Sequence, residues 1–349
     1  MTVTETTNSD YSQLLPKRHP QQELFVCDVA DAVLKDVMQH LEHPFYSLSK
    51  KPDTAIRRYE HNGQWLEVTP SVKGLATIYD KDILIYCISQ IMAKLKRGEP
   101  VSQLVRITAR DLLIFANRGT SGPEYDALEE AIDRLAGTRI STNIRTNDEE
   151  EYGNFGLIDR GKVRRKPRDK SGKKGRLLWC EVTLSDWVFN AIEAHEVLTL
   201  HPDYFRLRKP LERRTYELAR KHCGTQSTWS ISIPKLLKKS GSRSPEKRFR
   251  QMLKRIAANN HLPDYRVTLA DDVATFHNRD TMPGSGKASP IAVSLSPETY
   301  DEAKLVAPGW DVHLLEQQWR EWMKEPPRNP DAAFLGFCRK RYELRGRPG

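Results

Sequence analysis

Apolar side chains follow a helical period in two stretches of the chain that share the same internal order. In the first stretch, apolar residues recur every three or four positions from residue 80 to residue 95, which predicts a helix with one buried face. A short strand at 105–107 and a helix at 112–118 follow, and Gly119 ends that helix. A further helix, from residue 123, has one apolar stripe: Tyr125, Leu128, Ile132 and Leu135.

The same order returns 122 to 124 residues later. Three landmarks correspond: Thr108 and Ser232 at a helix start, Gly119 and Gly241 at a helix end, and Pro123 and Pro245 at the start of the next helix. Alternating segments complete each copy, at 139–146, 155–158 and 177–184 in the first and at 265–269 and 273–277 in the second. Helix, strand, two helices and a β-hairpin is the order of a winged helix-turn-helix.

We therefore predict an α+β fold with two tandem winged helix-turn-helix domains plus a small carboxy-terminal helical segment. The alternative is two small α+β domains that share these landmarks by chance, because capping residues, Pro at a helix start and Gly at a helix end occur in many helices. The predicted divisions are a flexible leader at 1–22, the first winged-helix domain at 23–206, the second at 207–279, a linker at 280–295 and the helical segment at 296–349.

Weaker sequence signals predict secondary structure in the amino-terminal and carboxy-terminal parts of the chain. A helix is expected around residues 29–41, and a hairpin is expected from 55–60 and 64–69 around the Asn62-Gly63 pair. The carboxy-terminal segment carries Trp and Phe at helical spacing, and such side chains need burial. We expect its helices to pack on themselves or on the second winged helix, and a docking face for a partner protein is the alternative.

Charge separates the two copies. The whole chain has a net charge of +10, which favours a polyanionic partner. Residues 245–259 contain five basic residues and one acidic residue, whereas residues 123–135 contain five acidic residues and one basic residue. Because phosphate repels an acidic helix, we predict that only the second copy reads bases and that the first packs, dimerises or touches the DNA backbone.

The predicted recognition helix places polar and basic residues opposite an apolar arc that includes Phe249 and Leu253. Its expected DNA contacts are Lys247, Arg248, Arg250, Gln251, Lys254 and Arg255. Long side chains with several donors suit both base edges and phosphates. The alternative is a basic face that is only solvated.

A second basic feature spans residues 161–176, with nine basic residues and one acidic residue. Few of its side chains are apolar, so we expect a flexible loop that tracks phosphates as the wing of the first domain and does not specify sequence. The expected phosphate contacts are Lys162, Arg164, Arg165, Lys166, Arg168, Lys173, Lys174 and Arg176. A solubilising loop without a partner is the alternative.

Several function classes are disfavoured. No apolar run approaches the roughly 20 residues of a membrane span, and no secretory signal begins the chain, so a cytoplasmic protein is expected. The five cysteines form no Cys-x-x-Cys pair, so we expect neither a disulfide framework nor a metal site. Gly284-Ser285-Gly286-Lys287 lacks the rest of a phosphate loop, and no nucleophile or two-metal motif is found. We expect no enzyme and no cofactor.

Four sequence blocks are similar to a known family: SLSKKPDTAIRRYEHNG, GLATIYDKDILIYCISQIM, DYFRLRKPLERRTYELARKHCG and LPDY. They resemble the plasmid replication initiator protein A family of proteobacteria over about residues 17–280. The two-unit layout is also similar, less closely, to that of the iteron-binding plasmid initiators. This resemblance implies a protein that binds its double-stranded plasmid origin as monomers and represses its own promoter as a dimer, the first winged helix dimerising.

The resemblance further implies opening of the duplex and recruitment of host factors, such as the host initiator and the replicative helicase. By topology it places DNA contacts on Lys247, Arg250, Gln251 and Lys254. We expect direct repeats spaced about one helical turn apart, because two units would cover consecutive major grooves. A winged-helix transcriptional repressor is the first alternative, and a DNA-nicking enzyme is the second.

Overall fold

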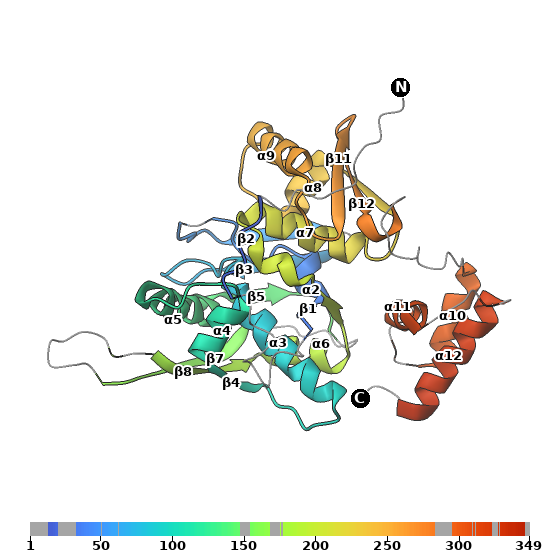
Figure 1. Cartoon of the computed structure of the whole chain (residues 1–349), viewed down its shortest axis with the longest axis horizontal. Coiled ribbons are helices and arrows are strands. Elements are labelled where there is room, and N and C mark those ends of the chain that lie inside the picture. The colour runs from blue at the N-terminus through green and yellow to red at the C-terminus, as the bar shows by residue number, and fades with distance from the viewer. Residues whose placement is uncertain are drawn as a thin grey trace.

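The computed structural model contains one mixed helix and sheet body and a separate group of three helices at the carboxy-terminal end (Figure 1). It describes residues 13–19, 33–49, 51–61, 63–146, 154–167, 175, 177–282, 295–308, 310, 312–322, 327 and 329–345.

The amino-terminal part supplies a short strand and a hairpin. Strand β1 (Lys35–Val37) leads directly into α2 (Met38–Glu42), and β2 (Arg57–His61) pairs with β3 (Gln64–Thr69). The hairpin was predicted. The helix expected at 29–41 was wrong over β1, because Lys35–Val37 pairs antiparallel with β9 (Val197–Thr199), and residues 21–32 lie outside the described part.

The first helix-and-strand unit has a three-stranded antiparallel sheet in the order β4-β8-β7. Two more strands of this unit, β5 and β6, pair instead with the amino-terminal hairpin, in a second sheet of order β2-β3-β5-β6. The elements of the unit are α3 (Lys81–Lys96), β4 (Leu104–Thr108), α4 (Ala109–Phe115), α5 (Gly122–Gly137), β5 (Arg139–Thr142), β6 (Asn154–Gly156), β7 (Ile158–Arg165) and β8 (Leu177–Leu184).

The second unit repeats this layout with shorter strands. Its sheet has the order β10-β12-β11, so the first, last and middle strands of each unit take the same places. Its elements are α7 (Pro210–His222), β10 (Thr228–Ser232), α8 (Ile233–Ser240), α9 (Glu246–Asn259), β11 (Tyr265–Ala270) and β12 (Val273–Asn278), followed by the 3-10 turn η3 (Arg279–Thr281). The element order predicted from the sequence is thus present twice.

Of Gly119 and Gly241, the two corresponding glycines predicted to end a helix, only Gly241 does so. Gly241 ends α8 in the left-handed conformation, with φ +71°. In the first unit α4 ends at Phe115, before Gly119, and Asn117, with φ +53°, takes the left-handed conformation that Gly241 takes after α8. Asparagine tolerates this conformation better than most residues, so it replaces glycine here.

One hydrophobic core runs through both units. Between them lie α6 (Asp186–Glu193), β9 and the 3-10 turn η2 (Pro202–Arg206). Helix α7 has no solvent face over most of its length, since every residue from Leu211 to Ala219 is buried. The core therefore continues without interruption across the segment where we predicted a domain boundary.

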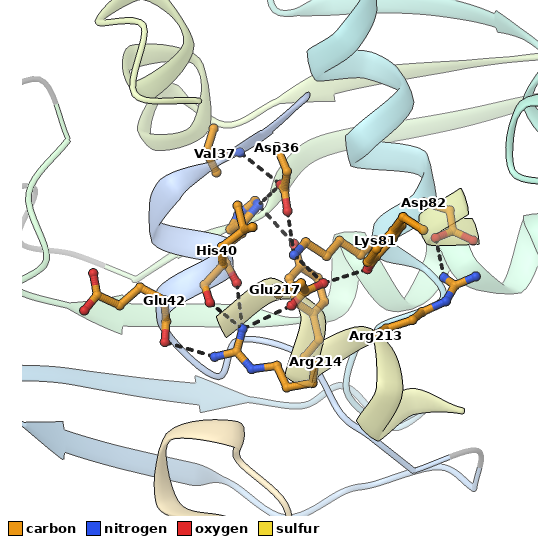
Figure 2. Close-up of polar contacts among 12 residues, drawn as sticks. Asp36, Val37, His40, Glu42, Lys81, Asp82, Arg213, Arg214 and Glu217 are labelled. Carbon is orange, nitrogen blue, oxygen red and sulfur yellow. Dashed lines mark hydrogen bonds and ion pairs between the residues drawn. The ribbon is translucent and has the colours of Figure 1, made fainter. Parts of the chain in front are cut away.

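Charged side chains on α7 are buried together with charged partners from the first half of the chain (Figure 2). Glu217 pairs with Lys81 at 2.9 Å, and Lys81 pairs with Asp36 at 2.5 Å. Burial acts to raise the pKa of Asp36, but the Lys81 charge and the contacts with His40 hold it below its ordinary value. Asp36 is therefore ionised, and the buried charges compensate one another.

Arg214 of α7 fixes the second unit to the amino-terminal part. Its guanidinium donates to the carbonyl oxygens of Leu41 at 2.9 Å and Glu42 at 3.0 Å, at the end of α2 (Figure 2). It also donates to the Lys239 carbonyl of α8 at 3.1 Å. One side chain thus joins α2 to the first helix of the α8–α9 pair, which positions that pair on the body.

The carboxy-terminal helices form their own core. They are α10 (Pro297–Val306), α11 (Val312–Trp322) and α12 (Pro330–Arg345), set to one side of the body in Figure 1. Trp319 and Phe334 are buried against each other, as the aromatic spacing predicted. The contact with the body includes the stacking of Trp310 on His195, with ring centroids 6.1 Å apart. No helix in the described ranges has the length and apolar character that crossing a membrane requires.

Candidate nucleic-acid interface

Helix α9 presents one apolar and one cationic face. Phe249, Leu253 and Ile256 are buried in the second unit, as predicted from their spacing. Five of the six predicted contact residues lie on the exposed face: Lys247, Arg248, Gln251, Lys254 and Arg255. The helix lies at the outer edge of the molecule, at the end opposite the β4-β8-β7 sheet (Figure 1).

The two ends of α9 are held by specific contacts. Before it, the turn at Gly241 lies against the amino-terminal part, so closely that a Cβ on Gly241 would lie 2.6 Å from the Pro44 Cβ. After it, Asn260 takes the left-handed conformation with φ +46°, and the Arg279 guanidinium donates to its carbonyl oxygen at 2.8 Å. The turn before α9 is therefore held against the amino-terminal part, and the end of α9 is held within the second unit.

Arg250 differs from the other basic residues of the helix. Its side chain is one-third exposed, and its guanidinium forms ion pairs with Glu246, one turn earlier, and with Asp272 at the β11–β12 turn. Among the residues that the structure describes, Lys247, Arg248, Lys254 and Arg255 form no ion pair with a carboxylate. Arg250 therefore has the least unneutralised charge to offer to a phosphate.

A groove of about 880 Å³ runs along the inner edge of the exposed face of α9. Arg248, Gln251 and Arg255 line one side, and the segment 48–57 lines the other. Arg243, in the turn before α9, and Lys209, before α7, also line it. The cationic surface therefore extends beyond the helix.

Arg243 is held in this groove by a carboxylate. Asp53 pairs with Arg243 at 3.0 Å, while the Arg243 side chain is still 64% exposed. Burial acts to raise the pKa of Asp53, but the hydrogen bond and charge of Arg57, with the charge of Arg243, lower it below its ordinary value. Asp53 therefore stays ionised and orients Arg243 toward the groove.

Sequence reasoning did not find Arg243 or Lys209. The signal available was a basic residue in the predicted turn between two helices, in Ser242-Arg243-Ser244, and another directly before Pro210. Neither position could be assigned to a groove from sequence alone, because the groove forms only where the segment 48–57 packs beside these residues.

The β11–β12 hairpin of the second unit has an acidic tip. Asp271 and Asp272 form the turn, with φ of +44° and +65°. Both residues are exposed, and Asp272 pairs with Arg250. The tip therefore carries the charge opposite to that of the helix beside it.

The first unit has the reverse arrangement, an acidic helix beside a basic hairpin. On α5, Asp126 and Glu129 pair with Arg165 of β7, at 3.0 and 2.6 Å. Asp133 pairs with Lys73, a residue of the amino-terminal part. Cations of the same chain therefore neutralise part of the acidic face.

The basic stretch 161–176 was predicted as a loop, and this was wrong for its first five residues. Strand β7 continues to Arg165 because its backbone pairs with β8 as far as Leu177. Gly161 lets α5 lie close to this strand, since a Cβ there would clash with Ile132. Lys162, Arg164 and Lys166 are exposed, whereas Arg165 is mostly covered and paired with α5. The remaining predicted contacts lie outside the described residues: Arg168, Lys173, Lys174 and Arg176.

Comparisons with known proteins place the chain in a family. The family model of Replication initiator protein A matches residues 35–267. A putative replication protein of Wigglesworthia glossinidia brevipalpis is 38% identical over 272 residues, which make up 76% of this chain and 96% of that protein.

Two solved structures of RctB domains 2 and 3 also align, both at 14% identity. One covers 69% of this chain and 98% of its own, with a TM-score of 0.49. The other covers 72% of this chain and 96% of its own, with a TM-score of 0.46. From the family model and the 38% identical relative, the chain belongs to the Replication initiator protein A family.

Proposed function

We propose that this protein is a plasmid replication initiator that binds repeated sites in origin DNA through its second unit, acting as a winged helix with α9 in the major groove. One observation carries the proposal: α9 buries Phe249, Leu253 and Ile256 and exposes a continuous row of cations and one amide. Arginine and lysine donate hydrogen bonds to guanine O6 and N7, and the glutamine amide can hydrogen-bond to adenine N6 and N7. Family membership supports the same function.

We assign the first unit to a winged helix as well, but with a different role. Because α5 carries acidic residues, it would be repelled by a duplex, and we assign it to packing or self-association. The exposed Lys162 and Arg164 of the adjoining hairpin are suited to phosphate contacts. Origin opening, with recruitment of a host initiator and the replicative helicase, completes the proposal and derives from the family resemblance.

Two single substitutions on α9 separate base readout from charge. Gln251→Ala should weaken binding to the origin repeat about 10-fold without changing the salt dependence, because glutamine carries no charge. Lys254→Ala should also weaken binding and reduce the slope of log K against log salt by about 0.9 if it contacts a phosphate. Binding is measured by fluorescence anisotropy on repeat and scrambled duplexes.

Lys96→Ala is the matched control, because it removes one exposed lysine from a helix of the first unit. It should leave affinity for the repeat within twofold of the wild type. Equal affinities for all three variants and the wild type would refute the role of α9.

A plasmid maintenance assay separates an initiator from a repressor with the same DNA-binding parts. A plasmid that carries this gene and its candidate origin should persist in a host with no other initiator. Loss of the plasmid, together with intact binding to the repeats, would favour the repressor.

The proposal includes no enzymatic step and no cofactor, since the sequence contains no nucleophile or phosphate-loop motif. Supercoiled origin DNA incubated with the protein and Mg²⁺ should therefore remain unnicked. Appearance of a nicked product would indicate that the protein is a DNA-nicking enzyme instead.

A further inference from the structure

The sheet of the first unit has one covered and one open face. Ile107, Cys180 and Val182 are buried on the side of α4 and α5. On the opposite side, Leu104 is 53% exposed and the Arg106 side chain is 67% exposed. We call this side the Trp179 face, and it comprises Leu104, Arg106, Arg160, Lys162, Arg164, Trp179 and Glu181.

Trp179 lies at the centre of this face on the middle strand, β8. Its direct neighbours are Thr108 on β4 and Arg164 on β7. The Arg106 guanidinium lies 4.6 Å from the centroid of the indole ring, and the Lys162 ammonium lies 5.8 Å from it. The ring is partly exposed, between cations from both outer strands.

A single carboxylate holds these cations beside the ring. Glu181 pairs with Arg106 at 2.6 Å and with Lys162 at 3.8 Å. The face contains four cations, and Glu181 is its single carboxylate among the described residues, so it remains positive. The aromatic and cationic groups are thus arranged before any partner arrives.

The chemistry of this face selects among classes of partner. A protein partner would be expected to meet a more apolar surface, but among the described residues of this face Leu104 is the one large exposed aliphatic side chain. Duplex DNA offers phosphates to the cations, but its bases are stacked and cannot lie on an indole. A single strand offers both phosphates and free base faces, which stack on aromatic rings and on guanidinium planes.

We propose that the Trp179 face binds single-stranded DNA, with one base stacked at Trp179 and Arg106 and the flanking phosphates on Lys162 and Arg164. The inference rests on the proposed function, because an opened origin is the source of the strand. The Trp179 face and α9 lie at opposite ends of the body in Figure 1, so one molecule can hold a duplex repeat and a separated strand at once.

The full chain is titrated into a fluorescein-labelled dT oligonucleotide of about 16 nucleotides, a length within the usual range for one single-strand binding fold. Wild-type protein should bind in a salt-dependent manner. Trp179→Ala should weaken this binding about 10-fold, and Trp179→Phe should retain most of it, because phenylalanine keeps a stacking surface. Arg106→Ala should weaken it severalfold.

Trp65→Ala is the matched control. Trp65 is also a partly exposed tryptophan on a sheet with an arginine over its ring, Arg58 at 5.8 Å. There, however, Arg58 pairs with both Glu60 and Glu67, so the surroundings are not cationic. Trp65→Ala should bind the dT oligonucleotide as the wild type does.

Three outcomes would overturn the inference: no binding of dT by the wild type, equal weakening by Trp65→Ala and Trp179→Ala, or at least tenfold preference for the matching uridine oligonucleotide. Binding to the duplex repeat distinguishes this inference from the proposed function. Trp179→Ala should keep duplex binding, and Lys254→Ala should keep dT binding. If the wild type binds the duplex repeat but not dT, only the role of the Trp179 face is refuted. If the wild type binds dT but not the duplex repeat, the role of α9 is refuted.

Discussion

Individual cations in this protein differ in what they can offer to DNA. Arg250 and Lys254 lie on the same helix, yet Arg250 pairs with Glu246 and Asp272. The spacing of α9 predicted both residues as contacts. It could not predict the pairing with Asp272, because that residue comes 22 positions later, at a turn whose place beside α9 depends on the folded sheet.

Asp272→Asn should therefore strengthen binding to the origin repeat, by roughly threefold at low salt, because it releases the Arg250 guanidinium toward DNA. Asp271→Asn removes the same charge from the same turn without breaking that ion pair. It is the control, and it should have the smaller effect in the same anisotropy titration. A larger gain from Asp271→Asn would show that only net charge matters.

Arg164 and Arg165 provide a second pair of neighbours with different surroundings. Arg164→Ala should reduce the slope of log K against log salt for the dT oligonucleotide by about 0.7, because this exposed residue is free to neutralise a phosphate of a single strand. Arg165→Ala should leave the slope unchanged, since Asp126 and Glu129 already neutralise the guanidinium. Titrations at four salt concentrations measure both slopes. The reverse ranking would place the DNA on the α5 side of the hairpin.

At the scale of elements, the helices were predictable and the shortest strands were not. Helical spacing of apolar residues located α3, α5 and α9. Helices α5 and α9 each bury one face, whereas α3 is buried on all sides from Lys81 to Ser89. Strand β1 has three residues, and its partner β9 lies about 160 positions away, so no local pattern marks it. Within 161–176, the density of charge hid the alternation of β7, whose covered side is formed by Gly161, Val163 and Arg165.

The α8–α9 turn was predictable in position but not in its contact with the amino-terminal part. Gly241→Ala should lower the free energy of unfolding by about 2–4 kcal/mol, through the left-handed backbone and the clash with Pro44. Gly98→Ala is the control: its φ is +74°, but nothing lies within 4 Å of the added Cβ. It should cost about 1 kcal/mol. Urea denaturation measures both, and equal losses would exclude the Pro44 contact as a cause.

At the scale of the whole molecule, α7 joins the two halves through buried charges. The repeated order of elements predicted a helix in the place of α7, but Arg214 and Glu217 would be expected on a surface from sequence alone. Their burial follows from partners far away in the chain: Lys81 for Glu217, and the carbonyl oxygens at the end of α2 for Arg214. Such pairings can be recognised only in the tertiary structure. The burial of α7, and with it the continuous core, was therefore not predicted.

The junction of α2, α7 and α8 should make stability depend on pH. Burial lowers the pKa of both His43 and His222 to about 4, while Glu42 and Lys239 lie nearby. In the unfolded chain a histidine has a pKa of about 6.5. Between these values the unfolded chain binds more protons, so the free energy of unfolding falls as the pH falls from about 6.5 to about 4.

Urea midpoints at pH 7.5 and pH 5 measure this loss. A double variant, His43→Gln with His222→Gln, should show a smaller fall between the two pH values than the wild type. His201→Gln, which changes a partly exposed ring outside this junction, should behave as the wild type does. An unchanged fall in the double variant would assign the pH dependence to other groups.

The most direct test of the central claim is methylation interference on the origin fragment. Methylation of guanine N7 blocks the major groove without changing the phosphates. If α9 reads bases there, interference should fall on guanines within each repeat, about one helical turn apart, and should weaken at defined positions for Gln251→Ala. Binding that is indifferent to N7 methylation, or an interference pattern that no substitution on α9 alters, would contradict the account.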